Sequence, residues 1–511
     1  MREFWQKFLK IASSAVVLAV FALLAYAEIY VFVSSSFFEI NRALYGGAVL
    51  SVFLIALFGA LTLFFGVSLY LSLYHKEVER CGVLTFAAEL LTIAVGAVLP
   101  LILYFARTVE SAVFLKTLPY FLAGLAAVAF LLLIPLAKKR WYLAFVAIAV
   151  TVIAILGFSA VSAHGDNVSF EADPVVFDNG KDFSVVWCTD VNSVGYLEYS
   201  YGGQTHVVYD EEDGKYRADG RVHVAHVPYD HLYGNTYTVS SAKVLRNATK
   251  YSKIGKFVTS ESYAFAEKVT GDSLKMLSLT DWHEKNDSAY VLAAMRADYD
   301  LLLLMGDEIN YVNEFDDILN YVVIPGGNIS GGVKPVLFVR GNHETRGKYA
   351  EYLKGAIGMD SFYFTTSYGN VNLLVLDGAE DKPDSDPKSG GLFLSEAYRD
   401  RELDEMEALP VKGGVNVCLC HIPLFSTGKD TEQYARFSAL LEKHNVKLLL
   451  SGHEHYLEYE EGEAFDTLIA GGPTDTDGYV ACFVTINDKK ASVEAYNSKG
   501  TVATYGPIAL D

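Results

Sequence analysis

Five short clusters of histidine, aspartate and asparagine in the second half of the chain have residue types that could bind metal ions. They are Asp281-Trp-His283, Gly306-Asp307, Gly341-Asn342-His343-Glu344, the single His421, and Gly452-His453-Glu454-His455. Imidazole nitrogens, carboxylates and an amide oxygen are the ligands of borderline divalent ions such as Mn, Fe, Zn or Co. A lone Gly-Asp or Asp-x-His is frequent by chance, so the prediction of a metal site depends on the whole ordered series.

Each cluster directly follows a short apolar run that is typical of a buried β-strand. The five runs share this placement and cover residues 275–280, 301–305, 335–339, 415–420 and 446–450. In sheets of alternating strands and helices, ligands bind at the carboxyl ends of the strands. We therefore expect the five clusters to converge on one crevice.

The series resembles the calcineurin-like metallophosphoesterases, with the purple acid phosphatases as a close branch. Gly-Asn-His-Glu and Gly-His-Glu-His are the most specific motifs in this resemblance. The resemblance implies an α/β fold for residues 266–511, a four-layer β-sandwich flanked by helices, with two divalent metal ions. It also implies seven metal ligands, three for each ion and one that bridges them: Asp281, His283 and His455; Asn342, His421 and His453; and Asp307.

The implied activity is hydrolysis of phosphate monoesters or diesters, two options between which the sequence does not choose. Two cations about 3.5 to 4 Å apart lower the pKa of a shared water, and the bridging hydroxide attacks phosphorus. His343 would contact the substrate phosphate or protonate the leaving oxygen. Neither a Gly-x-Ser-x-Gly elbow nor a Walker-type glycine loop is present in the sequence.

One difference from the purple acid phosphatases bears on the metal. Their Gly-Asp-x-x-Tyr motif supplies a tyrosinate to ferric iron, whereas Tyr311 lies four residues after Asp307, one position too far, and His283 supplies a ligand instead. We therefore expect divalent metals at the site and interpret Tyr311 as a packing residue.

Residues beside the motifs are candidates for orienting the ligands, as hydrogen-bond partners of metal ligands commonly do. These are Glu344, Arg346 and Glu454. Arg346 either reaches a phosphate oxygen or is a solvated surface residue. The insertion at residues 378–393, rich in Asp, Gly, Ser and Pro, is expected to shape the rim of the pocket.

Residues 164–265 show short alternating runs separated by Asp-, Asn- and Gly-rich turns, a pattern typical of a small antiparallel β-sandwich. The segment resembles the fibronectin-like domain that precedes the catalytic domain in purple acid phosphatases, with Trp187 as the buried tryptophan of an early strand. Three histidines lie close together here, at positions 223, 226 and 231. Residues three apart on a strand face opposite sides, so we expect surface histidines and no metal site.

Cys418 and Cys420 lie two residues apart in an apolar run. Because this separation on a strand gives poor disulfide geometry, we interpret the pair as small buried hydrophobic residues.

Five apolar stretches in the first 163 residues are long enough to cross a bilayer as helices, which takes about 20 residues each. They cover residues 11–33, 47–74, 82–106, 117–137 and 141–163, so residues 1–163 are predicted to form an all-α bundle of five spans. Eight Lys and Arg residues fall on the side of the N-terminus and three on the other, which predicts a cytoplasmic N-terminus. An odd number of spans then places the catalytic segment outside the plasma membrane.

Charge divides the chain in the same way. The first 163 residues contain 11 of the 41 Lys and Arg residues and 7 of the 61 Asp and Glu residues. The remaining residues therefore contain 30 basic and 54 acidic side chains, a net charge of −24. This acidity argues against binding of nucleic acid through bulk charge. The expected partners are a phosphoester substrate and the lipid bilayer, and the sequence does not identify a protein partner.

Two alternatives remain open beside an anchored phosphoesterase. The catalytic segment could be a ligand-sensing ectodomain coupled to the membrane bundle, or the enzyme could act on lipid-linked phosphoesters at the membrane surface. The complete ligand set favours an active enzyme over a sensor that has lost its activity.

Overall fold

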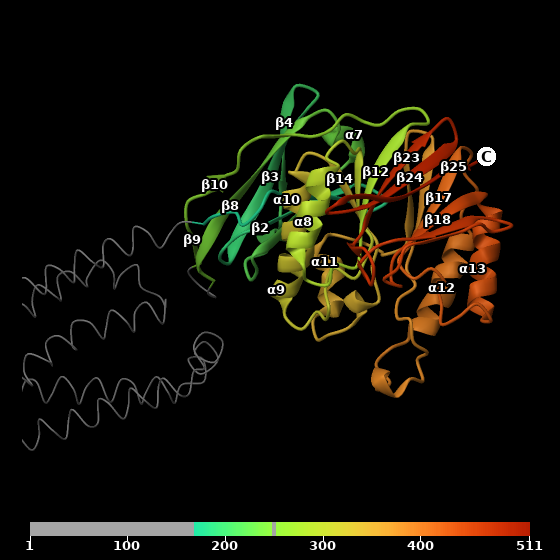
Figure 1. Cartoon of the computed structure of the whole chain (residues 1–511). Helices are drawn as coiled ribbons and strands as arrows, with labels where there is room; N and C mark the ends of the chain where they lie inside the picture. The colour runs from blue at the N-terminus through green and yellow to red at the C-terminus, as the bar shows by residue number, and fades with distance from the viewer. Residues whose placement is uncertain (1–167, 248–251) are drawn as a thin grey trace, which may run out of the picture. The chain divides into compact units, whose positions relative to one another are not determined.

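The computed structural model describes residues 168–247 and 252–511 (Figure 1). The five predicted membrane spans, within residues 1–163, lie outside these described residues. Within the two described ranges, no helix is both long and apolar enough to cross a bilayer.

Two large sheets make up most of the described chain. The nine-stranded sheet has the order β25-β24-β23-β12-β13-β14-β1-β2-β7, and the six-stranded sheet has the order β15-β16-β17-β18-β20-β19. The parallel centre of the first sheet consists of β12 (Leu274–Leu279), β13 (Leu301–Leu304) and β14 (Pro335–Phe338). The parallel centre of the second consists of β16 (Val371–Leu376), β17 (Val415–Cys420), β18 (Val446–Ser451) and β20 (Asp466–Ile469).

Antiparallel strands complete both sheets. At one edge of the nine-stranded sheet these are β23 (Ala481–Asn487), β24 (Lys490–Asn497) and β25 (Gly500–Ala509), which pair in succession beside β12. In the six-stranded sheet they are β15 (Phe364–Tyr368) and β19 (Glu458–Glu460), one at each edge.

The two sheets face each other, and helices cover their outer faces. Between the sheets, Leu301 and Leu303 of β13 share one apolar cluster with Val417 and Leu419 of β17. The outer face of the six-stranded sheet packs on α12 (Ser395–Glu407) and α13 (Glu432–Lys443). These layers match the sandwich flanked by helices that the sequence predicts for residues 266–511.

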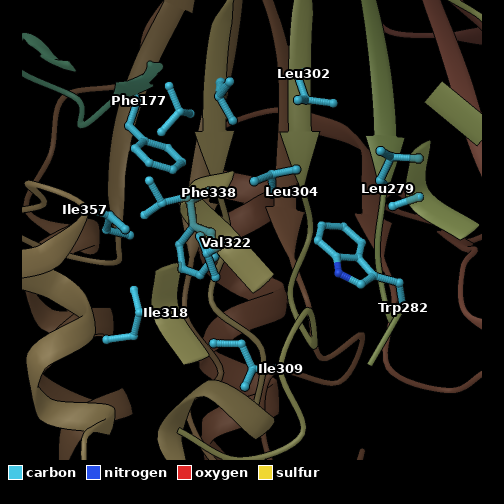
Figure 2. Close-up of a cluster of buried hydrophobic side chains, with 14 of the residues drawn as sticks. Phe177, Leu279, Trp282, Leu302, Leu304, Ile309, Ile318, Val322, Phe338 and Ile357 are labelled. Atoms are coloured by element: carbon cyan, nitrogen blue, oxygen red, sulfur yellow. The ribbon is translucent and has the colours of Figure 1, made fainter. Parts of the chain in front are cut away.

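The outer face of the nine-stranded sheet is covered by a second helical layer (Figure 2). Leu302 and Leu304 point to this side and share a cluster with Ile318 and Val322. The helical elements are α8 (Asn286–Met295), α9 (Phe315–Ile318), a π-helical turn (Leu319–Val323) and α10 (Ile324–Ser330). Alternate leucines of β13 thus face two different cores, which is why its run is continuously apolar.

The segment before the catalytic residues forms a β-sandwich, as its alternating pattern predicts. One layer contains β1 (Val175–Asp178), β2 (Phe183–Cys188) and β7 (Val222–Val227), and the other contains β3 (Ser193–Tyr201), β4 (Gln204–Tyr209), β8 (Thr236–Arg246) and β10 (Val258–Thr259). Trp187 is fully buried in the apolar cluster that these two layers share.

The sandwich differs from the expectation of a self-contained domain at residues 164–265. β1 pairs in parallel with β14, Val176 opposite Pro335 and Phe177 opposite Val336, so its first layer continues the nine-stranded sheet. Asn167–Val244 and Ile254–Asp511 accordingly form one compact unit. The physical reason is that β1 is apolar on both faces: Val176 packs inside the sandwich, whereas Phe177 packs under the helices of the catalytic segment.

One of the three predicted surface histidines of the sandwich is buried. His223 is 1% exposed, so its interpretation as a surface histidine is wrong. Its Nδ1 lies 2.8 Å from Asp210 Oδ2 and its Nε2 lies 2.6 Å from Ser193 Oγ. Both ring nitrogens therefore have hydrogen-bond partners, which offset the cost of burying the polar ring. His226, three residues along β7, is exposed on the opposite face as predicted.

Cys418 and Cys420 are free and buried, which confirms their interpretation as small hydrophobic residues.

Candidate metal centre

The predicted ligand clusters lie at the carboxyl ends of five strands from both sheets. Asp281 and His283 follow β12, Asp307 follows β13, and Asn342 and His343 follow β14, all in the nine-stranded sheet. The remaining ligands follow strands of the six-stranded sheet, His421 after β17 and both His453 and His455 after β18. The site therefore lies where the two sheets of the sandwich end together.

The ligand atoms converge into two groups that each fit within 4.8 Å, one formed by Asp281, His283 and His455 and the other by Asp307, His421 and His453. In the first group, the Nε2 atoms of His283 and His455 lie 2.9 Å apart. In the second, His421 Nε2 lies 3.2 Å from Asp307 Oδ2. Asp307 also falls within 4.8 Å of His283 and His343, so its carboxylate lies between the two groups.

The side-chain amide of Asn342 adds a further donor to the second group. One end of the amide lies 3.0 Å from His453 Nδ1 and 3.2 and 3.3 Å from the two carboxylate oxygens of Asp307. An amide oxygen at this end would face only acceptors, which is the environment of a ligand that shares a cation with its neighbours. Nitrogen, oxygen and carboxylate donors together fit a borderline divalent metal ion.

Two histidines at the site are oriented by backbone carbonyls. His421 Nδ1 lies 2.6 Å from Met305 O, and His343 Nδ1 lies 2.8 Å from Asn310 O. Each ring therefore turns its Nε2 toward Asp307, at 3.2 Å for His421 and 3.9 Å for His343. A hydrogen bond from one ring nitrogen fixes which nitrogen remains for a metal or a substrate.

The carboxylates dominate the electrostatics of the site. Burial alone would lower the pKa of the His421 imidazolium, but the charges of Asp307 and Asp281 outweigh burial and raise this pKa to about 10. Burial and the neighbouring His421 lower the pKa of His453 to about 4. The site thus contains a buried pair of carboxylates that attracts a positive charge, either a proton or a metal ion.

Backbone conformation at the site is unusual. Five of the seven predicted ligands have positive φ angles between 45° and 74°: Asp281, His283, Asp307, His453 and His455. Non-glycine residues in this region cost roughly 1–3 kcal/mol each and are concentrated at functional sites. The neighbouring glycines are also required, because a Cβ at Gly341 would overlap the Asp307 carboxylate and one at Gly452 would approach Asp281 Oδ2 to 2.5 Å.

Glu344 holds the loop that carries Asp307. It is fully buried, and its carboxylate accepts backbone N–H groups from Asp307 at 2.9 Å and from Ile309 and Gly341 at 3.0 Å. Glu344 is therefore a positioning residue, as its place beside the motif predicts. Glu454, by contrast, is an exposed residue.

Arg346 is mostly buried and paired with acids, so its interpretation as a solvated surface residue is wrong. Its guanidinium donates to both carboxylate oxygens of Glu380, at 2.7 and 2.6 Å, and to Asp381 Oδ1 at 2.9 Å. Its Nη1 also lies 3.1 Å from His343 Nε2. Asp381 itself lies close to the second ligand group, its Oδ2 3.8 Å from His453 Nε2.

Glu380 and Asp381 lie at the site, although no motif in the sequence singles them out. They lie in the 378–393 insertion, whose composition predicts a pocket rim but does not distinguish one acidic residue from another. The insertion does line a cavity of about 1130 Å³ beside His343, which confirms its predicted place. Tyr311 lines the same cavity, 50% exposed, so its interpretation as a packing residue is wrong.

Residues 274–457, which include all seven predicted ligands and His343, match the family model of the calcineurin-like phosphoesterases. These residues form a calcineurin-like metallophosphoesterase domain. Enzymes of this family use a dinuclear metal centre, and the two groups of donor atoms around Asp307 fit a pair of divalent ions.

Several solved structures have low similarity to the metallophosphoesterase. A purple acid phosphatase from yellow lupin (Lupinus luteus) seeds has 12% identity and a TM-score of 0.44, over 65% of this chain and 73% of that chain. The anchor protein GAP50 of the Plasmodium inner membrane complex has 14% identity and a TM-score of 0.36, over 47% and 90%. A phosphoesterase from E. coli has 15% identity and a TM-score of 0.24, over 47% and 100%. No curated protein matches the chain.

Proposed function

We propose that this metallophosphoesterase hydrolyses phosphate monoesters or diesters with a two-metal site built from the seven predicted ligands. The observation that supports the proposal is the position of Asp307. Its carboxylate lies between a group formed by Asp281, His283 and His455 and a group formed by His421 and His453, which the Asn342 amide extends. When bound, a divalent pair supplies Lewis acidity and a water of lowered pKa.

His343 is the proposed catalytic residue among the side chains that do not bind metal. Its Nδ1 is engaged by the carbonyl of Asn310, so its Nε2 is the atom that faces the substrate phosphate or the leaving oxygen. Arg346 Nη1 occupies a position 3.1 Å from that Nε2, and exchange of this contact for a substrate oxygen is part of the proposed binding step.

The activity is tested on the full chain, stripped of metal and then given Mn, Zn, Fe or Co, with aryl monoesters and aryl diesters as substrates. Hydrolysis of one class with at least one metal is expected, and the preferred class decides between monoesterase and diesterase. A folded protein that turns over neither class with any of these metals would refute the proposal.

A matched pair of carboxylate substitutions tests the role of Asp307. Asp307→Asn should reduce the metal content and remove nearly all turnover, because the neutral amide cannot bridge two cations. The control is Asp298→Asn, since Asp298 has a side chain that is 92% exposed and lies outside the predicted ligand set. Full turnover by the Asp307 variant would contradict the bridging role.

We also propose that the chain is anchored in the plasma membrane with the metallophosphoesterase domain outside the cell. The support is the sequence of residues 1–163, with five long apolar stretches and an excess of Lys and Arg on the side of the N-terminus. Added protease should digest the domain in intact cells. Protection of the domain until the cells are lysed would overturn the external location.

A further inference from the structure

The cavity beside His343 contains positive charge that the metal centre does not use. Six cationic side chains line it, of which three are paired with nearby acids: Arg340 with Asp377 at 2.6 Å, Arg346 with Glu380, and Lys382 with Asp381 at 2.7 Å. The other three have no acidic group within 4.0 Å in the described part of the chain: Lys348, Lys388 and Arg401. Although Glu351 also lines the cavity, three unpaired cations around one cavity in a segment of net charge −24 indicate a site for an anion.

The same cavity has a strongly apolar edge. Leu392 is 87% exposed and Leu394 is 73% exposed, the two most exposed large hydrophobic residues of the described chain, and both line the cavity together with Phe393. Exposed apolar side chains grouped on one loop are typical of contact with an apolar ligand or surface.

The loop that carries these leucines is held at its base. Arg399 is fully buried and donates to the carbonyls of Gly378 and Glu380 at 3.0 and 2.9 Å, and Asp384 Oδ1 accepts from Ser395 N at 2.8 Å. Figure 1 shows the segment, in orange, extending beyond the start of α12. The fold thus fixes the loop while its apolar tip remains in solvent.

Two residues of the cavity wall, Arg346 and Tyr311, neighbour His343 at the metal centre. Arg346 lies 3.1 Å from His343 Nε2, and the ring of Tyr311 lies 5.9 Å from the His343 ring. The cavity volume of about 1130 Å³ slightly exceeds the range of about 300–1,000 Å³ for sites that hold a drug-sized ligand, and is far more than a phosphate needs. The cations and the leucines line the same cavity as Arg346, so an occupant that contacts Arg346 there can also contact them.

We infer that the cavity binds the organic part of an amphiphilic phosphoester. Lys348, Lys388 and Arg401 bind a second anionic group of this substrate, and Leu392, Phe393 and Leu394 bind its apolar chain. The inference rests on the proposed function, because the phosphate that is hydrolysed sits at the metal centre. It assigns the substrate class: a phosphoester with at least one further negative charge and a long hydrocarbon chain.

The test measures competitive inhibition of aryl phosphoester hydrolysis by three phosphonates, on the full chain with restored metal. Butylphosphonate has a short chain, dodecylphosphonate has a long one, and 3-phosphonopropionate carries a second anion. Dodecylphosphonate should bind at least about tenfold more tightly than butylphosphonate, because the added methylenes cover the leucines. Equal inhibition constants for the two would overturn the inference.

Matched variants assign each preference to its residues. In the double variant Leu392→Ser, Leu394→Ser, the ratio of the inhibition constants of butylphosphonate and dodecylphosphonate should fall to about one. The control Val411→Ser changes a residue that is 51% exposed and lies outside the cavity, and it should keep the ratio of the unchanged protein. Lys348→Gln with Lys388→Gln should weaken 3-phosphonopropionate about tenfold relative to butylphosphonate, and the control Lys490→Gln should not. Preferences that persist in the cavity variants would refute the assignment.

Two further arms separate the possible outcomes. If no aryl ester is hydrolysed, dissociation constants of the three phosphonates from calorimetry replace the inhibition constants, so failure of the proposed function leaves the cavity testable. Dodecylphosphonate is also presented both as a free monomer and within phosphatidylcholine vesicles. Tighter binding from vesicles identifies a substrate that is taken from a bilayer, and tighter binding of the monomer identifies a soluble amphiphile.

Discussion

Metal binding at this site should release a proton from His421, and its affinity should rise with pH. In the metal-free protein, His421 Nδ1 donates to Met305 O and its Nε2 lies 3.2 Å from Asp307 Oδ2, so a proton on Nε2 completes an ion pair. The charges of Asp307 and Asp281 outweigh burial and raise the pKa of this imidazolium to about 10. A metal ion can bind Nε2 only after that proton has left.

The size of the effect follows from the distance between that pKa and the working pH. At pH 7, which is about three units below the pKa of His421, removal of the proton from the imidazolium costs about 4 kcal/mol. This cost is subtracted from the free energy of metal binding. The dissociation constant for Mn²⁺ should therefore fall about tenfold for each unit between pH 7 and pH 9. The hydrogen bond that His455 donates to Asp281 is the first cause of the raised pKa of His455, and it steepens the slope where that ring is also protonated.

The assay is competition with a chelator at several pH values, combined with calorimetry in two buffers of different ionisation enthalpy to count the protons released. His421→Gln should bind metal more weakly and release one proton fewer, whereas His226→Gln, on the exposed face of β7, should behave like the natural chain. Metal affinity that is independent of pH across this range would refute the electrostatic reasoning. Without metal, the ion pair stabilises the fold below the ordinary pKa of histidine, and this contribution is lost as the pH rises toward 10.

Three further substitutions test the shell around the metal centre. Gly341→Ala should lower the metal content measured by elemental analysis, because its Cβ overlaps the Asp307 carboxylate; unchanged content would contradict the packing requirement. Arg346→Gln should lower stability by about 3 kcal/mol, since it removes the bidentate partner of the buried Glu380 and leaves only Lys382, at 3.5 Å, and Glu380→Gln in addition should restore most of the thermal midpoint. Phe437→Ala should cost about 3–5 kcal/mol by opening a cavity under α13, without loss of metal; loss of both would show that the core and the site are coupled.

The placement of the polar clusters at strand ends is the feature of the structure that the sequence predicts best. Strand, turn and ligand follow one another within a few residues at each of the five clusters, so local patterns suffice to place Asp281, Asp307 or His421 at a strand end. The layers of the sandwich follow from continuously apolar runs such as that of β13. The positions of the ligands and the layers of the sandwich can both be predicted because each depends on residues that are adjacent in the sequence.

The features that the sequence does not predict depend on contacts between distant segments. The pairing of β1 with β14 joins residues about 160 positions apart, and nothing in the run Val175–Asp178 specifies that partner. The burial of His223 requires Asp210 and Ser193 from two other parts of the sandwich. Arg346 is likewise held by Glu380, which lies in the 378–393 insertion. The amino-acid composition of this insertion does not determine its conformation.

The left-handed backbone at the ligands has a consequence for mutational scanning. Aspartate, asparagine and histidine adopt positive φ angles several-fold more often than other non-glycine residues, so the metal and the backbone select the same residue types at Asp281, Asp307 and His453. Alanine at these positions would remove a ligand and also impose a backbone penalty of about 1 kcal/mol. An alanine scan would therefore report misfolding and lost chemistry together, whereas asparagine retains the conformation and isolates the loss of the ligand.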